Sequence, residues 1–170
     1  MNQTVTLRSA SPSEIDVAIA IDDAASTLYE TVGIRVDPTA DDPFAVAEHD
    51  RWRATAANGG MFFAMRDERP VGLLVFGRVD DAPYLEQLSV HPSAMRSGIG
   101  RRLLREAVAR ANGAGLWLTT YAHVPWTRPF YEREGFVVVP ESSCGPQVRA
   151  ILAEERRWLP EPQQRVAMRR

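Results

Sequence analysis

The chain contains no lysine, since all 20 of its Lys and Arg residues are arginine, against 22 Asp and Glu residues. This absence excludes Schiff-base chemistry on a lysine, and it excludes a P-loop, whose motif requires one. The formal net charge of -2 also provides no general basic field for nucleic acid, so no nucleic-acid partner is expected. The only cysteine, Cys144, excludes an intrachain disulfide and has no activating neighbour in the sequence, so we take it as incidental.

Long hydrophobic runs are missing as well. No stretch approaches the roughly 18 apolar residues of a membrane span, and the first residues lack the basic-then-apolar pattern of a signal peptide. We therefore expect a cytoplasmic protein without a membrane partner. No His, Cys, Asp and Glu grouping has the spacing of a metal site, so no metal is expected. A length of 170 residues with 45% hydrophobic content is typical of a single domain, residues 1–170.

The segment 90–111 carries charges that are unusual for the start of a helix. From Ile99 onward its apolar residues recur at helical spacing, which predicts an amphipathic helix. A helix N-terminus normally attracts acidic residues, yet this one carries only arginines at its start, namely Arg96, Arg101, Arg102 and Arg105. Ser97, Gly98 and Gly100 are small enough to let backbone N–H groups face a bound group. The combination predicts a phosphate-binding turn, and the alternative is a solvated basic helix with a glycine-rich entry.

The order of predicted elements indicates an α/β fold with a mixed, mostly antiparallel central sheet flanked by helices. Alternation and apolar runs predict strands at 5–7, 61–65, 71–76, 84–90, 116–121, 136–139 and 165–169. Helical spacing and end signals predict helices at 15–25, 44–57, 99–111, 126–134 and 148–159, with Ser11 capping the first and Thr127 the fourth. Meandering strands give antiparallel pairs, and the later crossover gives a parallel pair. The strand 84–90 should lie near the centre, which puts the phosphate site between Val90 and Leu103.

Two phosphate-binding patterns can be compared at this turn. A dinucleotide-type GxGxxG motif fails, because its third glycine position is Leu103. The sequence Arg96-Ser97-Gly98-Ile99-Gly100, after the strand that ends in Val90-His91-Pro92, instead resembles the acetyl-CoA site of the GNAT superfamily of N-acetyltransferases. The segment Tyr84–Val90 is similar to the central strand of that family. The segment 129–136, PFYEREGF, is similar to its short helix with a tyrosine. One departure is Met95, which stands where the family has Gln or Arg.

The resemblance, which covers roughly residues 62–139, implies a GNAT-like acyl-CoA N-acyltransferase fold and acetyl-CoA as co-substrate. Main-chain groups at the turn would hold the pyrophosphate, and those at the end of the central strand would pair with the pantetheine arm where the sheet splays. The implied cofactor-binding residues are Leu88, Ser89, Val90, Arg96, Ser97, Gly98, Ile99, Gly100 and Arg101. The last helix and strand would also allow a homodimer, by analogy with such proteins.

Acetyl transfer to an amine requires a general base and a general acid. Glu86 is the candidate base, through water, because burial within an apolar strand would raise its pKa; the alternative is a solvent-facing or paired carboxylate. Strand alternation puts Glu86 on the face of Leu88 and Val90 unless a bulge intervenes. Tyr131 is the candidate acid, because it matches the tyrosine of the family before Gly-Phe and a phenol suits a departing thiolate moderately well; the alternative is a packing tyrosine.

Other polar residues near the predicted site are weaker candidates. His91 and His123 follow strands and are alternative bases, and Thr127 is a partial substitute for the asparagine that often contacts the cofactor in relatives. For the acceptor, the segment 29–52 offers a carboxylate-rich rim that would suit a cationic amine, or is simply a solvated loop. Its acidic residues are Asp37, Asp41, Asp42, Glu48 and Asp50. Trp126 and Tyr121 are candidates for an aromatic wall.

The sequence thus predicts an N-acetyltransferase that transfers an acetyl group from acetyl-CoA to a primary amine of a small molecule or peptide by direct attack. The alternative from another class is a catalytically inactive module that binds or senses acetyl-CoA. Acyl groups longer than acetyl also stay open.

Overall fold

The structure is a computed structural model, and it describes residues 4–36 and 42–170. Within these residues the strands are β1 Val5–Ser9, β2 Met61–Arg66, β3 Arg69–Val79, β4 Ala82–Val90, β5 Trp117–Tyr121, β6 Val137–Val139 and β7 Arg165–Arg169. The α-helices are α1 Ile15–Ser26, α2 Pro43–Ala57, α3 Ile99–Ala111, α4 Arg128–Arg133 and α5 Pro146–Trp158. Short 3₁₀ helices occupy η1 Pro12–Glu14, η2 Thr27–Val32, η3 Pro92–Ala94, η4 Glu141–Ser143 and η5 Pro162–Gln164.

The strands form one mixed sheet in the order β1-β2-β3-β4-β5-β7-β6. Strands β4 and β5 are parallel, and every other neighbouring pair is antiparallel. This arrangement confirms the predicted mixed, mostly antiparallel sheet with the strand 84–90 at its centre. The sequence did not predict that β7 inserts between β5 and β6, because that pairing joins residues far apart in the chain.

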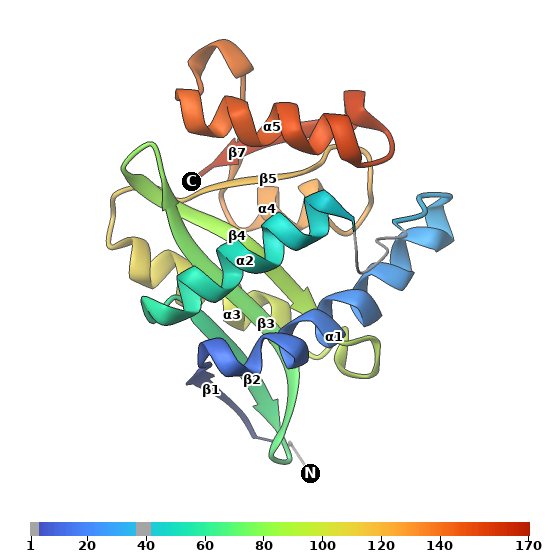
Figure 1. The fold of residues 1–170 in the computed structure, drawn as a ribbon, viewed down its shortest axis with the longest axis vertical. Coiled ribbons are helices and arrows are strands. Elements are labelled where there is room, and N and C mark those ends of the chain that lie inside the picture. Colours follow the sequence, from blue (N-terminus) through green and yellow to red (C-terminus); the bar gives the residue numbers. More distant parts are fainter. Residues whose placement is uncertain (1–3, 37–41) are drawn as a thin grey trace.

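Helices cover both faces of the sheet (Figure 1). On one face, α1 and α2 pack on apolar side chains of β2 and β3, among them Phe63 and Leu73. Helix α5 packs against Tyr84 and Trp117, and Figure 1 shows it in front of the sheet together with α1 and α2. On the other face, α3 buries Leu103 and its neighbours against the largest apolar cluster. Strands β3 and β4 at the centre therefore contact helices on both faces, α1 on one and α3 on the other.

Most of the predicted elements are present with shifted ends. Strand β3 continues to Val79, whereas the prediction stopped at residue 76, and α5 begins at Pro146 rather than 148. Helix α4 is shorter than predicted. Thr127 occupies its N-cap position, as predicted, but the side chain makes no capping hydrogen bond. The Thr127 hydroxyl instead donates to the carbonyl oxygens of Tyr121 at 2.6 Å and Val124 at 3.1 Å.

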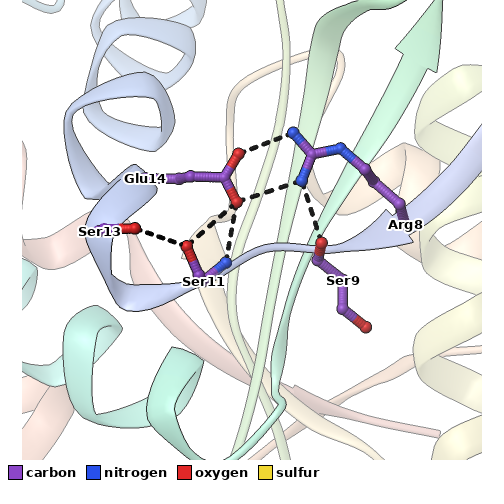
Figure 2. A network of polar contacts seen from close by, with 5 residues as sticks. All are labelled: Arg8, Ser9, Ser11, Ser13 and Glu14. Carbon is purple, nitrogen blue, oxygen red and sulfur yellow. Dashed lines mark hydrogen bonds and ion pairs between the residues drawn. The ribbon is translucent and has the colours of Figure 1, made fainter.

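The predicted start of the first helix at Ser11 is confirmed, with one 3₁₀ turn preceding α1. The backbone N–H of Ser11 donates to Oε2 of Glu14 at 2.9 Å, which is the return bond of a capping box. The guanidinium of Arg8 also pairs with this carboxylate, at 2.7 Å, and anchors β1 to the turn (Figure 2). The Arg8 charge and the Ser11 N–H lower the pKa of Glu14 to about 2.

Candidate active site

The turn between β4 and α3 presents unpaired backbone N–H groups. The first helical hydrogen bond runs from the N–H of Arg102 to the carbonyl of Gly98, at 3.0 Å. The preceding N–H groups of Ile99, Gly100 and Arg101 therefore have no partner within the helix. The residue at the cap position is Gly98, which has no side chain to satisfy them, and its φ of +81° is one that glycine adopts without strain. Arg96 also has a positive φ, +58°. The turn thus has the features of an anion site.

A cavity of about 590 Å³ begins at this turn and continues between β4 and β5. Arg96 and Arg101 line it, as predicted, whereas Arg102 and Arg105 do not. Arg101 also pairs with Glu134 at 2.6 Å, which reduces its free charge. Arg133 of α4 is a further lining arginine that sequence reasoning missed, because only the fold brings α4 beside the turn.

Ser97 lies in the turn, and it is not among the lining residues of the cavity. Its hydroxyl donates to the carbonyl of Ala94 at 2.5 Å and accepts from the guanidinium of Arg66 at 2.6 Å. Ser97 therefore ties the turn to strand β2 with its side chain, and any contact to a ligand falls to its backbone.

The sheet opens where the sequence predicted that it would splay. Strand β4 pairs with β5 only at Tyr84 and Trp117, and past this point the two strands diverge. The end of β4, namely Leu88, Ser89 and Val90, lines the cavity along this opening. Helix α3 comes close to the end of β4 at Gly100. A Cβ at this position would lie 3.7 Å from Val90 and 3.9 Å from Leu88.

A β-bulge in β4 decides which way Glu86 points. Val75 of β3 lies opposite Gln87, and Phe76 lies opposite Leu85, so Glu86 is the extra residue. Glu86 and Gln87 therefore lie on the same face, toward α1 and α2, where their side chains bond Thr55 and Asp22. Simple alternation would have placed Glu86 with Leu88 and Val90 on the α3 face, and the bulge reverses this.

The Glu86 carboxylate is held by contacts from two other elements, α2 and β3. Its Oε1 accepts a hydrogen bond from the hydroxyl of Thr55 on α2, at 2.8 Å. It also lies directly over Gly77 of β3, where a Cβ would approach Oε1 to 2.0 Å. Its other oxygen, Oε2, is buried and has no hydrogen-bond partner among the described residues. Burial raises the pKa of Glu86, and the Thr55 hydrogen bond opposes this rise. Burial therefore makes this carboxylate a stronger proton acceptor than one exposed to water.

Tyr131 lines the same cavity as Glu86, so the fold brings the two predicted catalytic residues together. Its ring packs edge-on against Phe130 and Phe136, with centroids 5.2 and 5.7 Å away. Burial raises the pKa of Tyr131. The phenol therefore keeps its proton at neutral pH, and the same shift makes it a weaker acid toward a leaving thiolate.

The weaker candidates differ in whether they line the cavity. His91 accepts a hydrogen bond at Nδ1 from the N–H of Ser93 and caps η3, while His123 is exposed beside Tyr121, and neither lines the cavity. Thr127 lines the cavity, but its hydroxyl is used by the backbone bonds described above.

The aromatic wall is only partly as predicted. Trp126 lines the cavity together with Tyr29, and the centroids of their rings are 5.9 Å apart. Tyr121 is not a lining residue but is buried behind them, with its hydroxyl donating to the carbonyl of Pro160. Tyr29, which sequence reasoning did not select, therefore takes the place predicted for Tyr121.

The acidic residues of the predicted rim have different roles in the structure. Asp37 and Asp41 lie outside the described residues. Asp42 caps α2, and Asp50 pairs with Arg53 on the surface at 2.7 Å. Glu48 lines a second cavity of about 320 Å³, which Glu86 also borders. Burial and the charge of Asp22 raise the pKa of Glu48 to about 8.

Asp22 of α1 is the site residue that sequence reasoning missed most completely. It lines the main cavity, and its Oδ1 accepts hydrogen bonds from the side chains of Gln87 and Ser89, both at 2.5 Å. Burial raises the pKa of Asp22. In the sequence it is one of two consecutive aspartates on a predicted helix, and nothing local distinguishes it from its exposed neighbour Asp23.

Residues 4–36 and 42–170 contain no group of three or more His, Cys, Asp or Glu side chains arranged to hold a metal ion. None of the helices in these ranges combines the length and the hydrophobicity that a membrane span requires.

The model of the Acetyltransferase (GNAT) family matches residues 23–136. A GNAT-family acetyltransferase from Staphylococcus aureus Mu50 superposes with a TM-score of 0.73, at 15% identity and 98% coverage of both chains. The PaiA N-acetyltransferase of Thermoplasma acidophilum, in complex with coenzyme A, gives a TM-score of 0.65 at 16% identity, again with 98% coverage of both chains.

A third structure is the N-acetylglutamate synthase of Neisseria gonorrhoeae, complexed with coenzyme A and N-acetyl-glutamate. It gives a TM-score of 0.67 at 17% identity and covers 98% of this chain, which spans only 35% of the synthase. At these identities the structures establish the fold. The family match, which extends over about two thirds of the chain and includes β4, the turn and α4, establishes more: the chain belongs to the GNAT family of acetyltransferases.

Proposed function

We propose that this chain is an acetyl-CoA-dependent N-acetyltransferase that acts on a primary amine by direct attack. The observation that carries the proposal is one continuous cavity, lined by Glu86, Tyr131 and the free N-terminus of α3. The PaiA and synthase structures named above are complexes with coenzyme A, which supports the same ligand for this chain.

The lining of the cavity supports a ligand with an anionic diphosphate and a long polar arm. The N–H groups of Ile99, Gly100 and Arg101 would bind phosphate oxygens, with Arg96 and Arg133 near them. The arm would extend along the exposed edge of β4 beside Leu88 and Val90, where β5 has diverged. Met95 replaces the polar side chain common in the family, so binding at the turn would rely on backbone groups.

Acetyl-CoA supplies an activated thioester, and the residues of this chain would move the protons. Glu86 would accept one proton from the acceptor ammonium through water, which leaves a neutral amine to attack the thioester carbonyl carbon. A C–N bond forms and the C–S bond breaks, and Tyr131 would donate its proton to the leaving sulfur. The nitrogen then loses a second proton, which restores Tyr131. The net reaction therefore releases one proton per amide formed.

The test measures thiol release from acetyl-CoA with a panel of primary amines. Glu86→Gln and Tyr131→Phe should each lower kcat by about 10²-fold or more, while coenzyme A binding measured by calorimetry stays unchanged. Turnover that survives both substitutions would refute the roles given to these residues. Coenzyme A binding by the wild type without thiol release for any amine would instead favour an inactive acetyl-CoA-binding module.

The cofactor site has its own test, and the other end of α3 provides a matched control. Gly98→Trp should abolish coenzyme A binding, because a bulky residue with φ near +81° is strained and would cover the turn. Gly113→Trp introduces the same residue at a similar φ of +79° just past the C-terminal end of α3, where it does not line the cavity, so this variant should bind normally. Equal binding by the two variants would contradict the placement of the diphosphate.

A further inference from the structure

The main cavity has positive and negative sides. Arg96, Arg101 and Arg133 line it around the turn that follows Val90. Asp22 and Glu86 line it on the face of β4 that α1 and α2 cover. The arginines suit the phosphates of the proposed cofactor, but the carboxylates have no role in binding it. Their position calls for a second ligand of the opposite charge.

Asp22 is held as a fixed acceptor. Two donors from β4, the amide of Gln87 and the hydroxyl of Ser89, bond the same oxygen, Oδ1. The other oxygen, Oδ2, accepts no hydrogen bond from the described residues. It is also not fully enclosed by them. Because Asp22 lines the cavity, Oδ2 remains open to a ligand there.

No arginine neutralises Asp22. Within residues 4–36 and 42–170 it takes part in no ion pair, and Arg165, which lines the same cavity, is already paired with Glu155 at 2.9 Å. Burial raises the pKa of Asp22, which shows that its surroundings disfavour an uncompensated charge. A cation in the cavity would supply the missing partner.

The surroundings of Asp22 suit an ammonium group on an aliphatic or aromatic body. The rings of Tyr29 and Trp126 line the same cavity, and aromatic faces attract cations. A carboxylate beside the reacting nitrogen would meet the negative charges of Asp22 and Glu86, which would repel it.

We propose that Asp22 binds the ammonium group of the acceptor, and that the acceptor is therefore an amine with no carboxylate next to its reacting nitrogen. This inference rests on the proposed acetyltransferase function. Asp22 acts in binding, and Glu86 then takes the proton, so the loss of Asp22 should appear in the KM for the amine rather than in kcat.

The experiment compares amines in pairs that differ only by the carboxylate: phenethylamine with phenylalanine, n-butylamine with 2-aminopentanoate, and ethylamine with alanine. In each pair the carboxylate-free amine should have the higher kcat/KM in the thiol-release assay. Asp22→Asn keeps the shape of the side chain and an oxygen for Gln87 and Ser89. It should raise the KM for the best amine about tenfold or more, with the KM for acetyl-CoA unchanged. Asp23→Asn, at the exposed neighbouring position, is the matched control and should leave both constants as in the wild type.

The outcomes separate the two proposals. If no amine releases thiol, the acetyltransferase function itself fails. If an amine is acetylated but Asp22→Asn raises its KM less than about threefold, or if the carboxylate-bearing members are preferred, only the role of Asp22 is overturned. Ser89→Ala provides a second variant in case Asp22→Asn folds poorly. It loosens the carboxylate without removing its charge, and it should raise the KM for the amine by a smaller factor than Asp22→Asn does.

Discussion

Thr55 of α2 and Glu86 of β4 are 31 residues apart in the chain and joined by a hydrogen bond of 2.8 Å. This bond reaches the carboxylate from the helix layer, while the bulge turns it toward that layer and Gly77 leaves space beneath it. Three elements therefore determine the position of one side chain. The same arrangement makes the proton affinity of Glu86 adjustable from outside the cavity, since Thr55 lines neither of the two cavities described above.

Thr55→Val should shift the pH dependence of the reaction toward higher pH. The hydrogen bond from Thr55 lowers the pKa of Glu86 against the effect of burial, so its loss raises that pKa further. A general base works only when deprotonated, and the acidic limb of the kcat/KM profile should therefore move up by about one pH unit. Thr55→Ser keeps the hydroxyl and should restore the wild-type profile. An acidic limb that stays in place, or moves down, would contradict the coupling between the two residues.

Gly77→Ala should impair catalysis through Glu86 alone. The added Cβ would lie 2.0 Å from Oε1, so the carboxylate must move. We expect kcat to fall on the order of a hundredfold, with the KM for acetyl-CoA unchanged because Gly77 does not line the cavity. In the Glu86→Gln background, the same substitution should lower kcat little further, since both changes remove the function of the same carboxylate. Additive losses in the double variant would show that Gly77 acts elsewhere.

The predictable part of the site is its backbone. The turn with Gly98 and Gly100 could be placed because glycines, small residues and a helical pattern follow one another within a short segment. The opening between β4 and β5 followed from the family resemblance. The strand order up to β5 followed from short connections, which leave few topologies.

The unpredicted part consists of contacts made across the fold. The bulge at Glu86 depends on the register between β3 and β4, and the alternation of apolar residues cannot show an inserted residue. Asp22 and Arg133 enter the cavity from helices far from the turn in sequence. Thr127 was placed correctly at the start of α4, but the local pattern could not show that its hydroxyl donates to nearby carbonyls and makes no cap bond.

Glu14→Gln should make the protein less stable at neutral pH but not in strong acid. The Arg8 pair and the Ser11 N–H hold the pKa of Glu14 at about 2, against a reference of 4.5. The carboxylate therefore contributes stability above about pH 4.5, and that contribution is lost as the pH falls toward 2. Because Arg8 is 43% exposed, we expect the substitution to lower the free energy of unfolding at pH 7 by only about 0.5–1 kcal/mol.

Urea unfolding at pH 7 and pH 2.5 measures the difference between wild type and variant. The control is Glu30→Gln, at an exposed position. A difference at pH 2.5 as large as that at pH 7 would refute this origin.

The buried pair of Glu155 and Arg165 joins α5 to β7, with the two side chains only 12% and 9% exposed. Glu155 also accepts a hydrogen bond from the hydroxyl of Thr119 at 2.7 Å, and the guanidinium of Arg165 lies over the ring of Tyr121 at 4.5 Å. Although burial works against its charge, the charge of Glu155 raises the pKa of Arg165. Removing one partner therefore leaves a charge that burial penalises and nothing compensates.

Glu155→Leu should accordingly lower the free energy of unfolding by about 3 kcal/mol. The double variant Glu155→Leu with Arg165→Met should recover a large part of that loss, because apolar side chains of similar size replace both charges. Urea unfolding of the four proteins at pH 7 gives the coupling energy of the pair. Asp50→Ala, in the exposed pair with Arg53, should cost no more than about 0.5 kcal/mol and is the surface control. If the two buried substitutions simply add, the pair does not hold α5 to the sheet through its charges, and packing by the stems of the two side chains must do so instead.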